Sequence, residues 1–169
     1  YNLWGLNPAG FRLSNLILHL FNSILVFYLI FLIFKNQLLA AASSILFLVH
    51  PVHISTVSYI SARGDLLSGF FILACCILFL RFLDSKNYGF YFLSILAAAL
   101  ALLSRENALL IIFFLSLIIW PRGHGLPFSR QSHKYLTGFF ILGVVYFSIR
   151  LIVLGPSGWF AHPAYVSGV

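Results

Sequence analysis

The stretch Leu13 to Phe34, LSNLILHLFNSILVFYLIFLIF, decides the fold, because it is long and apolar enough to cross a lipid bilayer as one helix. At a rise of 1.5 Å per residue, it extends about 33 Å, which matches a hydrocarbon core of about 30 Å. The whole chain has the same character, since 62% of its residues are hydrophobic and only 8% are charged. We therefore predict an all-α, polytopic transmembrane helical bundle and not a soluble core.

Six apolar segments follow one another, and polar breaks separate them. The first, third and sixth are long enough to span a bilayer as helices, whereas the second, fourth and fifth fall short and predict helices with recessed ends. The segments are roughly Leu13 to Phe34, Leu38 to Val49, Leu66 to Leu83, Tyr88 to Leu103, Ala108 to Trp120 and Tyr135 to Leu154. We assign residues 1–155 to one transmembrane domain and residues 156–169 to an exported tail or the start of a further segment.

The fourth and fifth segments predict a helical hairpin. One continuous helix from Tyr88 to Trp120 would run about 50 Å, well beyond the hydrocarbon core. The polar stretch Ser104-Arg105-Glu106-Asn107 fits better as the tip of a hairpin, in or near a cavity where charge is solvated. The stretch His50 to Asp65, rich in Ser, Thr and His, is likewise predicted to connect the second and third segments.

Basic residues predict the orientation of the bundle. If alternate connections share one side, one set holds six basic residues and one acid, which is typical of cytoplasmic loops. This set is Lys35, Arg81, Asp84, Lys86, Arg122, Arg130 and Lys134. The other set, Arg12, Arg63, Asp65, Arg105, Glu106 and Arg150, is then exported. There the acids stand beside the bases, which is typical of a pocket. The formal charge of +7 is thus a topology signal with no contiguous basic patch, and we expect no nucleic-acid partner.

Four polar residues of the first segment, Arg12, Asn15, His19 and Asn22, recur at spacings of three and four and share one helical face. The two amides and the imidazole either hydrogen-bond to neighbouring helices or contact a substrate. Arg12 lies at the exported end, where it either binds an anionic headgroup or phosphate, or extends its charge to the membrane surface.

His50 and His53 stand three residues apart, on either side of Pro51. This spacing can present two imidazoles to one metal, but nearby ligands to complete a metal site are lacking unless Asp65 or His162 supplies one. Hydrogen bonding is the favoured interpretation, and no metal or other cofactor is firmly implied, although a divalent metal remains compatible.

Arg63 and Asp65 open the third segment, and Arg105 and Glu106 occupy the next exported tip. Asp65 either caps its helix or belongs to a site. The charge of Arg63 requires a carboxylate, a phosphate or water as its partner. Its planar guanidinium can bind a phosphate through two parallel hydrogen bonds. An ion pair between the tips, Arg63 with Glu106 or Arg105 with Asp65, is the alternative to ligand binding.

The motifs together resemble the membrane-embedded glycosyltransferases of the GT-C superfamily, over about residues 1–120. The nearest branch carries tetratricopeptide repeats after its membrane domain and includes the transmembrane and TPR-containing O-mannosyltransferases and their bacterial relatives. The residues that carry the resemblance are Leu6-Asn7-Pro8-Ala9-Gly10-Phe11, Asn15-Leu16-Ile17-Leu18-His19, His50-Pro51-Val52-His53, Arg63-Gly64-Asp65-Leu66-Leu67-Ser68 and Leu103-Ser104-Arg105-Glu106.

The resemblance implies transfer of mannose or a similar hexose from a polyprenyl-phosphate carrier to a protein or glycan acceptor, on the exported face of a bacterial inner membrane or the endoplasmic reticulum membrane. We expect Arg12, Arg63 and Arg105 to bind the donor phosphate or headgroup. A supporting pocket is expected from His50, His53, Asp65, Glu106, Asn15 and His19. The chain begins at Tyr1 and is expected to be part of a longer protein, whose catalytic acid would lie upstream of Tyr1.

The second hypothesis is a non-catalytic membrane scaffold or lipid-binding subunit of a complex. The chain departs from the family pattern at two places, and the first of these, at Ser55, leaves room for this hypothesis. An acid often stands two residues after the second His of the His50 motif, where this chain has Ser55, and the later basic-acidic pair is often Lys-Glu, where this chain has Arg105-Glu106. Arginine carries the same charge as lysine, but its planar guanidinium binds partners with a different geometry from that of an ammonium group.

Overall fold

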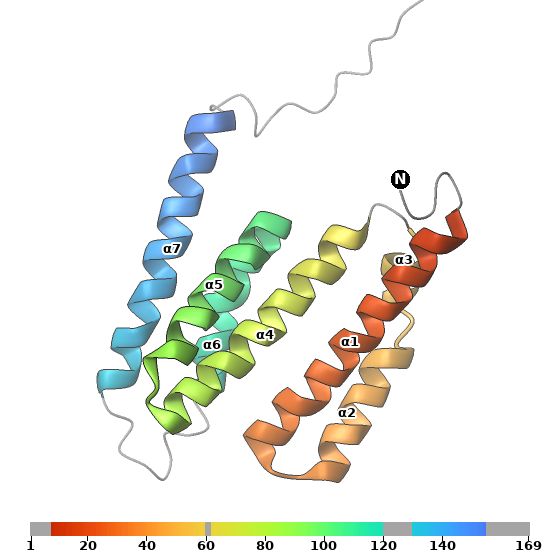
Figure 1. Cartoon of the computed structure of the whole chain (residues 1–169), viewed down its shortest axis with the longest axis horizontal. Helices are drawn as coiled ribbons and strands as arrows, with labels where there is room; N and C mark the ends of the chain where they lie inside the picture. Colours follow the sequence, from red (N-terminus) through yellow and green to blue (C-terminus); the bar gives the residue numbers. More distant parts are fainter. Residues whose placement is uncertain (1–7, 60–61, 120–129, 155–169) are drawn as a thin grey trace, which may run out of the picture.

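The computed structural model describes residues 8–59, 62–119 and 130–154, and every regular element within these ranges is a helix (Figure 1). The elements are α1 (Pro8–Phe34), α2 (Gln37–Val49), α3 (His53–Ser58), α4 (Arg63–Ser85), α5 (Tyr88–Ser104), the 3₁₀ helix η2 (Glu106–Leu110), α6 (Ile111–Ile119) and α7 (Arg130–Leu154). The prediction of an all-α helical bundle is confirmed.

Three helices are long and apolar enough to cross a membrane, and they coincide with the first, third and sixth predicted segments. Their apolar portions are Ala9–Phe34, Arg63–Ser85 and Lys134–Val153. The short segments also form short helices, as expected. Helix α1 begins five residues before the predicted segment, because a proline is tolerated in the first turn, where its missing N–H would have no helical partner.

The same two-residue turn, Lys-Asn, closes two helix pairs. Lys35 and Lys86 both adopt the left-handed conformation, with φ of 56°, directly after α1 and α4. The Asn that follows each lysine caps the next helix: Asn36 accepts from the N–H of Leu39, and Asn87 accepts from the N–H of Gly89. Both turns lie at the lower end of the bundle in Figure 1, and they fix α1 against α2 and α4 against α5.

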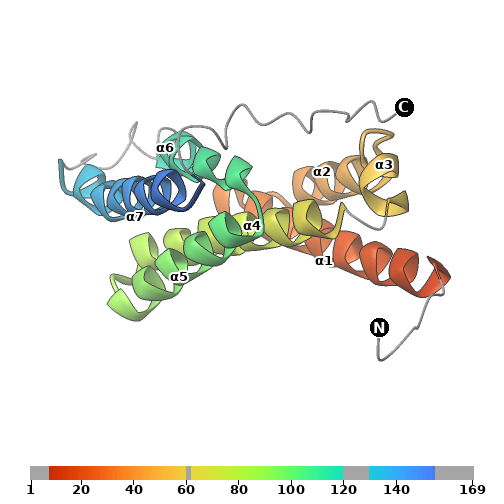
Figure 2. The same ribbon diagram turned by 90° about the horizontal axis from the view of Figure 1, so that it is seen from above.

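Helix α4 is the centre of the bundle, because it packs against α1 on one side and α5 on the other (Figure 2). Its large side chains Phe79, Leu80 and Phe82 are fully buried. Ala97 and Ala101 of α5 are buried in the same cluster. Small residues let helix backbones approach closely, which drives packing in membranes where the lipid is as apolar as the core.

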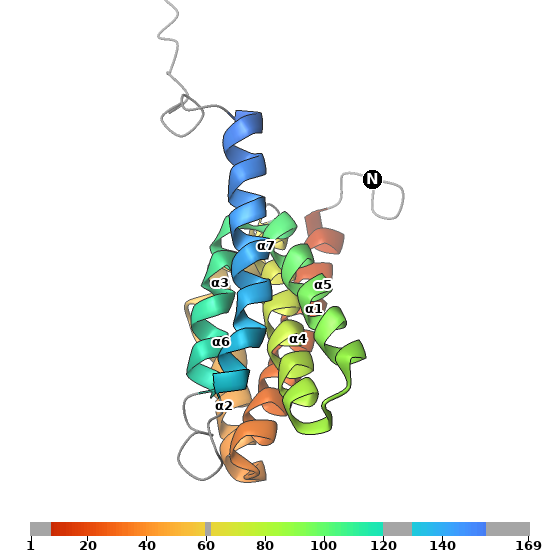
Figure 3. The ribbon, with the colours of Figure 1, turned by 90° about the vertical axis from the view of Figure 1, so that its left-hand side faces the viewer.

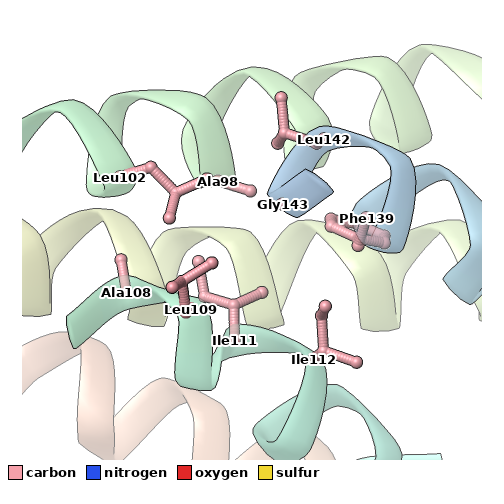
Figure 4. A pocket seen from close by; sticks show the side chains of 9 residues that line it. All are labelled: Ala98, Leu102, Ala108, Leu109, Ile111, Ile112, Phe139, Leu142 and Gly143. Atoms are coloured by element: carbon pink, nitrogen blue, oxygen red, sulfur yellow. The ribbon is translucent and has the colours of Figure 1, made fainter. Parts of the chain in front are cut away.

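The chain reverses at Arg105, whose extended backbone (φ −158°, ψ 141°) ends α5 and precedes η2. The predicted break at residues 104–107 is therefore confirmed. Helix α6 then runs back and packs against α4 and α7, and α7 also contacts α5 (Figure 3). At the junction of α5, α6 and α7 lies an apolar crevice of about 10 Å³ that contains no charged side chain (Figure 4). Its lining is Ala98, Leu102, Ala108, Leu109, Ile111, Ile112, Phe139, Leu142 and Gly143.

The stretch His50 to Asp65 connects α2 to α4, as predicted, and it also contains the short helix α3, which was not predicted. The N–H of His53 donates to the carbonyl of His50 (3.0 Å), and the N–H of Ile54 donates to that of Pro51 (3.0 Å). These bonds start a six-residue helix whose sequence, HISTVS, is rich in residues of low helix propensity and too short to show periodicity. The expected tail, residues 156–169, lies outside the described residues.

Candidate functional site

The alternating helix directions bring the predicted exported residues to one end of the bundle, which we call the mixed-charge end (the upper end in Figure 1). It holds Arg12, Arg63, Asp65, Arg105, Glu106 and Arg150, at the starts of α1 and α4, at the α5–η2 tip and near the end of α7. Lys35, Arg81, Asp84, Lys86 and Lys134 lie at the opposite end, where Arg130 starts α7, and Arg122 lies outside the described residues. The separation of the two charge sets is thus a property of the fold.

The polar face of α1 holds neighbouring elements together. Asn15, His19 and Asn22 are between 1% and 3% exposed. The amide of Asn15 donates to the Tyr59 carbonyl (3.0 Å), that of Asn22 donates to the Leu66 carbonyl (3.0 Å), and Nε2 of His19 lies 3.1 Å from the Leu48 carbonyl. The interpretation as interhelical hydrogen bonds is confirmed, because each side chain is bound to the backbone of another segment.

Arg63 links α4 to the start of α1. Its guanidinium donates to the hydroxyl of Ser14 and lies 5.9 Å from the centre of the Phe11 ring. Arg63 and Arg12, which follows Phe11 at the start of α1, are both exposed, and neither forms an ion pair with an acid in the described ranges. The corner therefore presents two positive charges that no carboxylate of the described chain neutralises.

Asp65 and Arg105 form the tip-to-tip ion pair that was one of the predicted alternatives. Nε of Arg105 lies 2.8 Å from Oδ1 of Asp65, and Nη2 lies 2.8 Å from Oδ2, so the contact is bidentate. The prediction that Asp65 caps α4 is wrong, because the helix starts at Arg63 after Ala62, and the Asp65 carboxylate turns to Arg105. A side chain on Gly64 would meet the Ser104 carbonyl at 3.4 Å, which shows how closely α4 approaches this tip.

Glu106 forms an ion pair with Arg150 of α7. The other predicted pair, Arg63 with Glu106, is therefore not formed. Arg150 also donates to the hydroxyl of Tyr146, one turn earlier on its own helix (3.1 Å). Two ion pairs therefore connect α4, the α5–η2 tip and α7 at the mixed-charge end. The acids that sequence proximity assigned to a pocket serve in this structure as bridges between helices.

His50 and His53 meet His19 beside a cavity of about 270 Å³ between α1, α2 and α3. The ring of His53 lies 5.0 Å from that of His19, 6.2 Å from that of His50 and 4.4 Å from that of Phe47, measured between centres. Partial burial, and next the His19 and His50 rings, lower the pKa of His53. Among the described residues no three His, Cys, Asp or Glu side chains are arranged to hold a metal ion.

Sequence reasoning missed two partners in this region. Ser14 gives no signal of its own, since a serine in an apolar helix is ordinary, and its role depends on where Arg63 lies. Arg150 was placed at the correct end but not matched with Glu106, because hydropathy does not show which helix faces the α5–η2 tip. The side chain of Ser55, where the resemblance expects an acid, lies outside the described residues.

A family model described as dolichyl-phosphate-mannose-protein mannosyltransferase matches residues 1–151. Among curated proteins, the chain is 31% identical over 109 residues to protein O-mannosyl-transferase Tmtc1 of Drosophila melanogaster, which covers 64% of this chain and 13% of that protein. It is 35% identical over 103 residues to protein O-mannosyl-transferase TMTC1 of Homo sapiens, covering 60% and 12% respectively.

Human protein O-mannosyl-transferase TMTC3 matches most of the chain, with 29% identity over 165 residues that cover 91% of this chain and 18% of that protein. The chain thus spans less than a fifth of the length of these curated relatives. No solved structure matches the chain significantly.

Proposed function

Since the chain belongs to the dolichyl-phosphate-mannose-protein mannosyltransferase family, we propose that it forms part of a multi-pass membrane glycosyltransferase with a polyprenyl-phosphate-linked sugar as donor. The sugar is mannose or a similar hexose, and a protein or glycan hydroxyl on the exported face accepts it. The mixed-charge end faces that side, because the opposite end carries the excess of lysine and arginine that favours the cytoplasm.

The observation that carries this proposal is the position of Arg63. Its guanidinium is exposed, is held by Ser14 and Phe11, and has no acidic partner within the described ranges. An arginine held in this way near the membrane boundary suits a phosphate, because the guanidinium is always charged and its planar N–H groups match two phosphate oxygens. Arg12, in the same corner, adds a second positive charge.

The reaction we propose is an inverting displacement at the anomeric carbon of the sugar. The acceptor oxygen forms a bond to this carbon, and the bond between the carbon and the lipid phosphate oxygen breaks, with its electron pair passing to the phosphate. Arg63 then stabilises the charge that develops on the leaving phosphate, which is the kind of interaction that lowers a barrier most. The proton of the acceptor hydroxyl passes to a general base.

Arg105 has a different first role in this proposal. Both oxygens of Asp65 already occupy one edge of its guanidinium, which fixes the first turn of α4 against the α5–η2 tip. Arg63 belongs to that first turn. Arg105 therefore acts as a positioning residue for Arg63, and contact with the phosphate falls mainly to Arg63 and Arg12.

Arg81 provides a matched control for a test of Arg63. It lies on the same helix at the opposite end, donates to the hydroxyl of Tyr28 on α1, and stands 5.6 Å from the centre of that ring. In the complete protein, Arg63→Ala should lower transfer from dolichyl-phosphate-mannose by about 100-fold or more, as expected for loss of a charge-stabilising group. Arg81→Ala should leave transfer nearly unchanged.

Expression level and oligomeric homogeneity of both variants are measured alongside turnover. Unchanged turnover in Arg63→Ala would remove this residue from the mechanism. An equal loss in both variants would show that the effect of Arg63 is structural and not specific to the mixed-charge end. A homogeneous wild-type protein with no transfer at all would favour the scaffold hypothesis.

A further inference from the structure

The cavity between α1, α2 and α3 combines five apolar side chains with three imidazoles. Its lining is Leu16, His19, Leu48, Val49, His50, His53, Ile54, Val57 and Ser58. Leu16 and His19 belong to the apolar span Ala9–Phe34, which places the cavity alongside a membrane-crossing helix. Leu16, on this helix, is 44% exposed, and an apolar side chain exposed on a membrane-crossing helix faces the bilayer. Val49 of α2 and Ile54 of α3, which also line the cavity, are 67% and 66% exposed.

The imidazoles at this cavity offer hydrogen-bonding atoms. Nδ1 of His50 accepts from the N–H of Val52 (3.2 Å), which leaves its Nε2–H as a donor. Nε2 of His19 donates to the Leu48 carbonyl, so its Nδ1 is an acceptor, and this buried atom has no hydrogen-bond partner. His53 lies between these two rings. An unpaired acceptor in a 3% exposed side chain indicates that a donor is missing from the described chain.

The lining of the cavity disfavours an anionic ligand. No lysine or arginine lines the cavity, whereas a phosphate would require a cation or several donors to leave water. Burial and the two neighbouring imidazoles lower the pKa of His53, so this ring resists taking up the proton that would attract an anion. A sugar, with hydroxyls all around its ring, would leave most of them unpaired against Leu16, Leu48, Val49, Ile54 and Val57.

We propose that the cavity bounded by His19, His50 and His53 binds an uncharged membrane alcohol, with its hydroxyl among the imidazoles and its apolar body along α1 and α2. Two lipids share this chemistry, a sterol and a linear isoprenoid alcohol. Arg63 does not line this cavity, so the proposal can be tested separately from phosphate binding and sugar transfer.

The test uses the full-length protein in nanodiscs and two photoreactive probes, a sterol and a linear isoprenoid alcohol, each as the free alcohol and as its methyl ether. The ether keeps the apolar body but cannot donate a hydrogen bond. Mass spectrometry should find labelled peptides from α1–α3, and the free alcohol should compete for labelling about tenfold better than the ether, as one hydrogen bond predicts. The probe that labels identifies which of the two lipids binds.

The chain contains an internal control for hydrogen bonding. A second groove of about 320 Å³ lies between α6 and α7, and Leu109, Ile112, Phe140, Gly143, Val144, Phe147 and Ser148 line it. No imidazole lines this groove, so any labelling there should not distinguish alcohol from ether. His53→Gln, which keeps a hydrogen-bonding group, should retain labelling of α1–α3, and His53→Phe should lose it.

If His53→Phe is not homogeneous, Val57→Trp fills the cavity from its apolar wall and should abolish the same labelling. Equal competition by alcohol and ether at α1–α3 would overturn the proposal, and so would absence of labelling by both probes. Phosphatidic acid that competes as well as the alcohol would also overturn it, since the site would then select anions. Arg63→Ala should retain labelling, which separates this test from that of sugar transfer.

Discussion

The ion pair between Asp65 and Arg105 gives the most demanding test of how the mixed-charge end is built. Its two contacts are both 2.8 Å, but the side chains are 38% and 46% exposed, so water screens the attraction strongly. Bidentate geometry places the pair near the upper limit for exposed pairs, about 1 kcal/mol. Asp65→Asn and Arg105→Gln should each lower the free energy of unfolding by about this amount.

The double variant should lose about as much as either single variant, because the interaction can be removed only once. The free energies are measured by reversible unfolding of the complete protein in mixed micelles. A double variant that loses the sum of the single effects, about 2 kcal/mol, would refute coupling between these side chains.

Exchanging the charges of residues 65 and 105 then tests whether Arg105 only positions Arg63 or itself contacts the phosphate. Asp65→Arg combined with Arg105→Asp restores opposite charges across the same two helices, and it should recover most of the sugar transfer that Asp65→Arg alone loses. Recovery of stability without recovery of transfer would mean that Arg105 itself must stand at position 105, in contact with the donor.

Three further predictions concern packing, pH and thiol exposure. Gly138→Ala should destabilise the chain by about 1–3 kcal/mol through overpacking, since its methyl group would overlap the Tyr91 hydroxyl, and added Tyr91→Phe should restore part of the loss in unfolding measurements. The lowered pKa of His53 means that the unfolded state binds more protons, so the stability of the chain should fall as pH drops below about 6.5, and His53→Gln should remove this slope. Cys75 and Cys76, 0% and 2% exposed, should resist maleimide in mild detergent and react only on unfolding; rapid labelling of the folded protein would contradict the packing of α4 against its neighbours.

Hydropathy was sufficient to predict the longer helices and the end of the bundle at which each charged residue of the described chain lies. A span such as α4 is visible because lipid demands a long apolar stretch, and the helix break at Arg105 is visible because charge interrupts one. Helix α3 was not predictable in the same way, since six residues are too few for a period to appear.

Partners of the charged residues required three-dimensional information. The sequence allowed Arg63 with Glu106 and Arg105 with Asp65 equally, because both pairs join the same two tips. The structure selects the second pair, while Glu106 turns to Arg150 on α7. Which acid a base meets depends on helix rotation and crossing, and hydropathy carries no information about these quantities.

The most direct test of the proposed phosphate corner is binding of a polyprenyl phosphate without sugar to the complete protein in nanodiscs. Arg63→Gln should weaken this binding about tenfold or more, as loss of a charge-assisted hydrogen bond predicts, while Arg81→Gln should bind like wild type. Equal affinity of wild type and Arg63→Gln would contradict the assignment of the phosphate to Arg63.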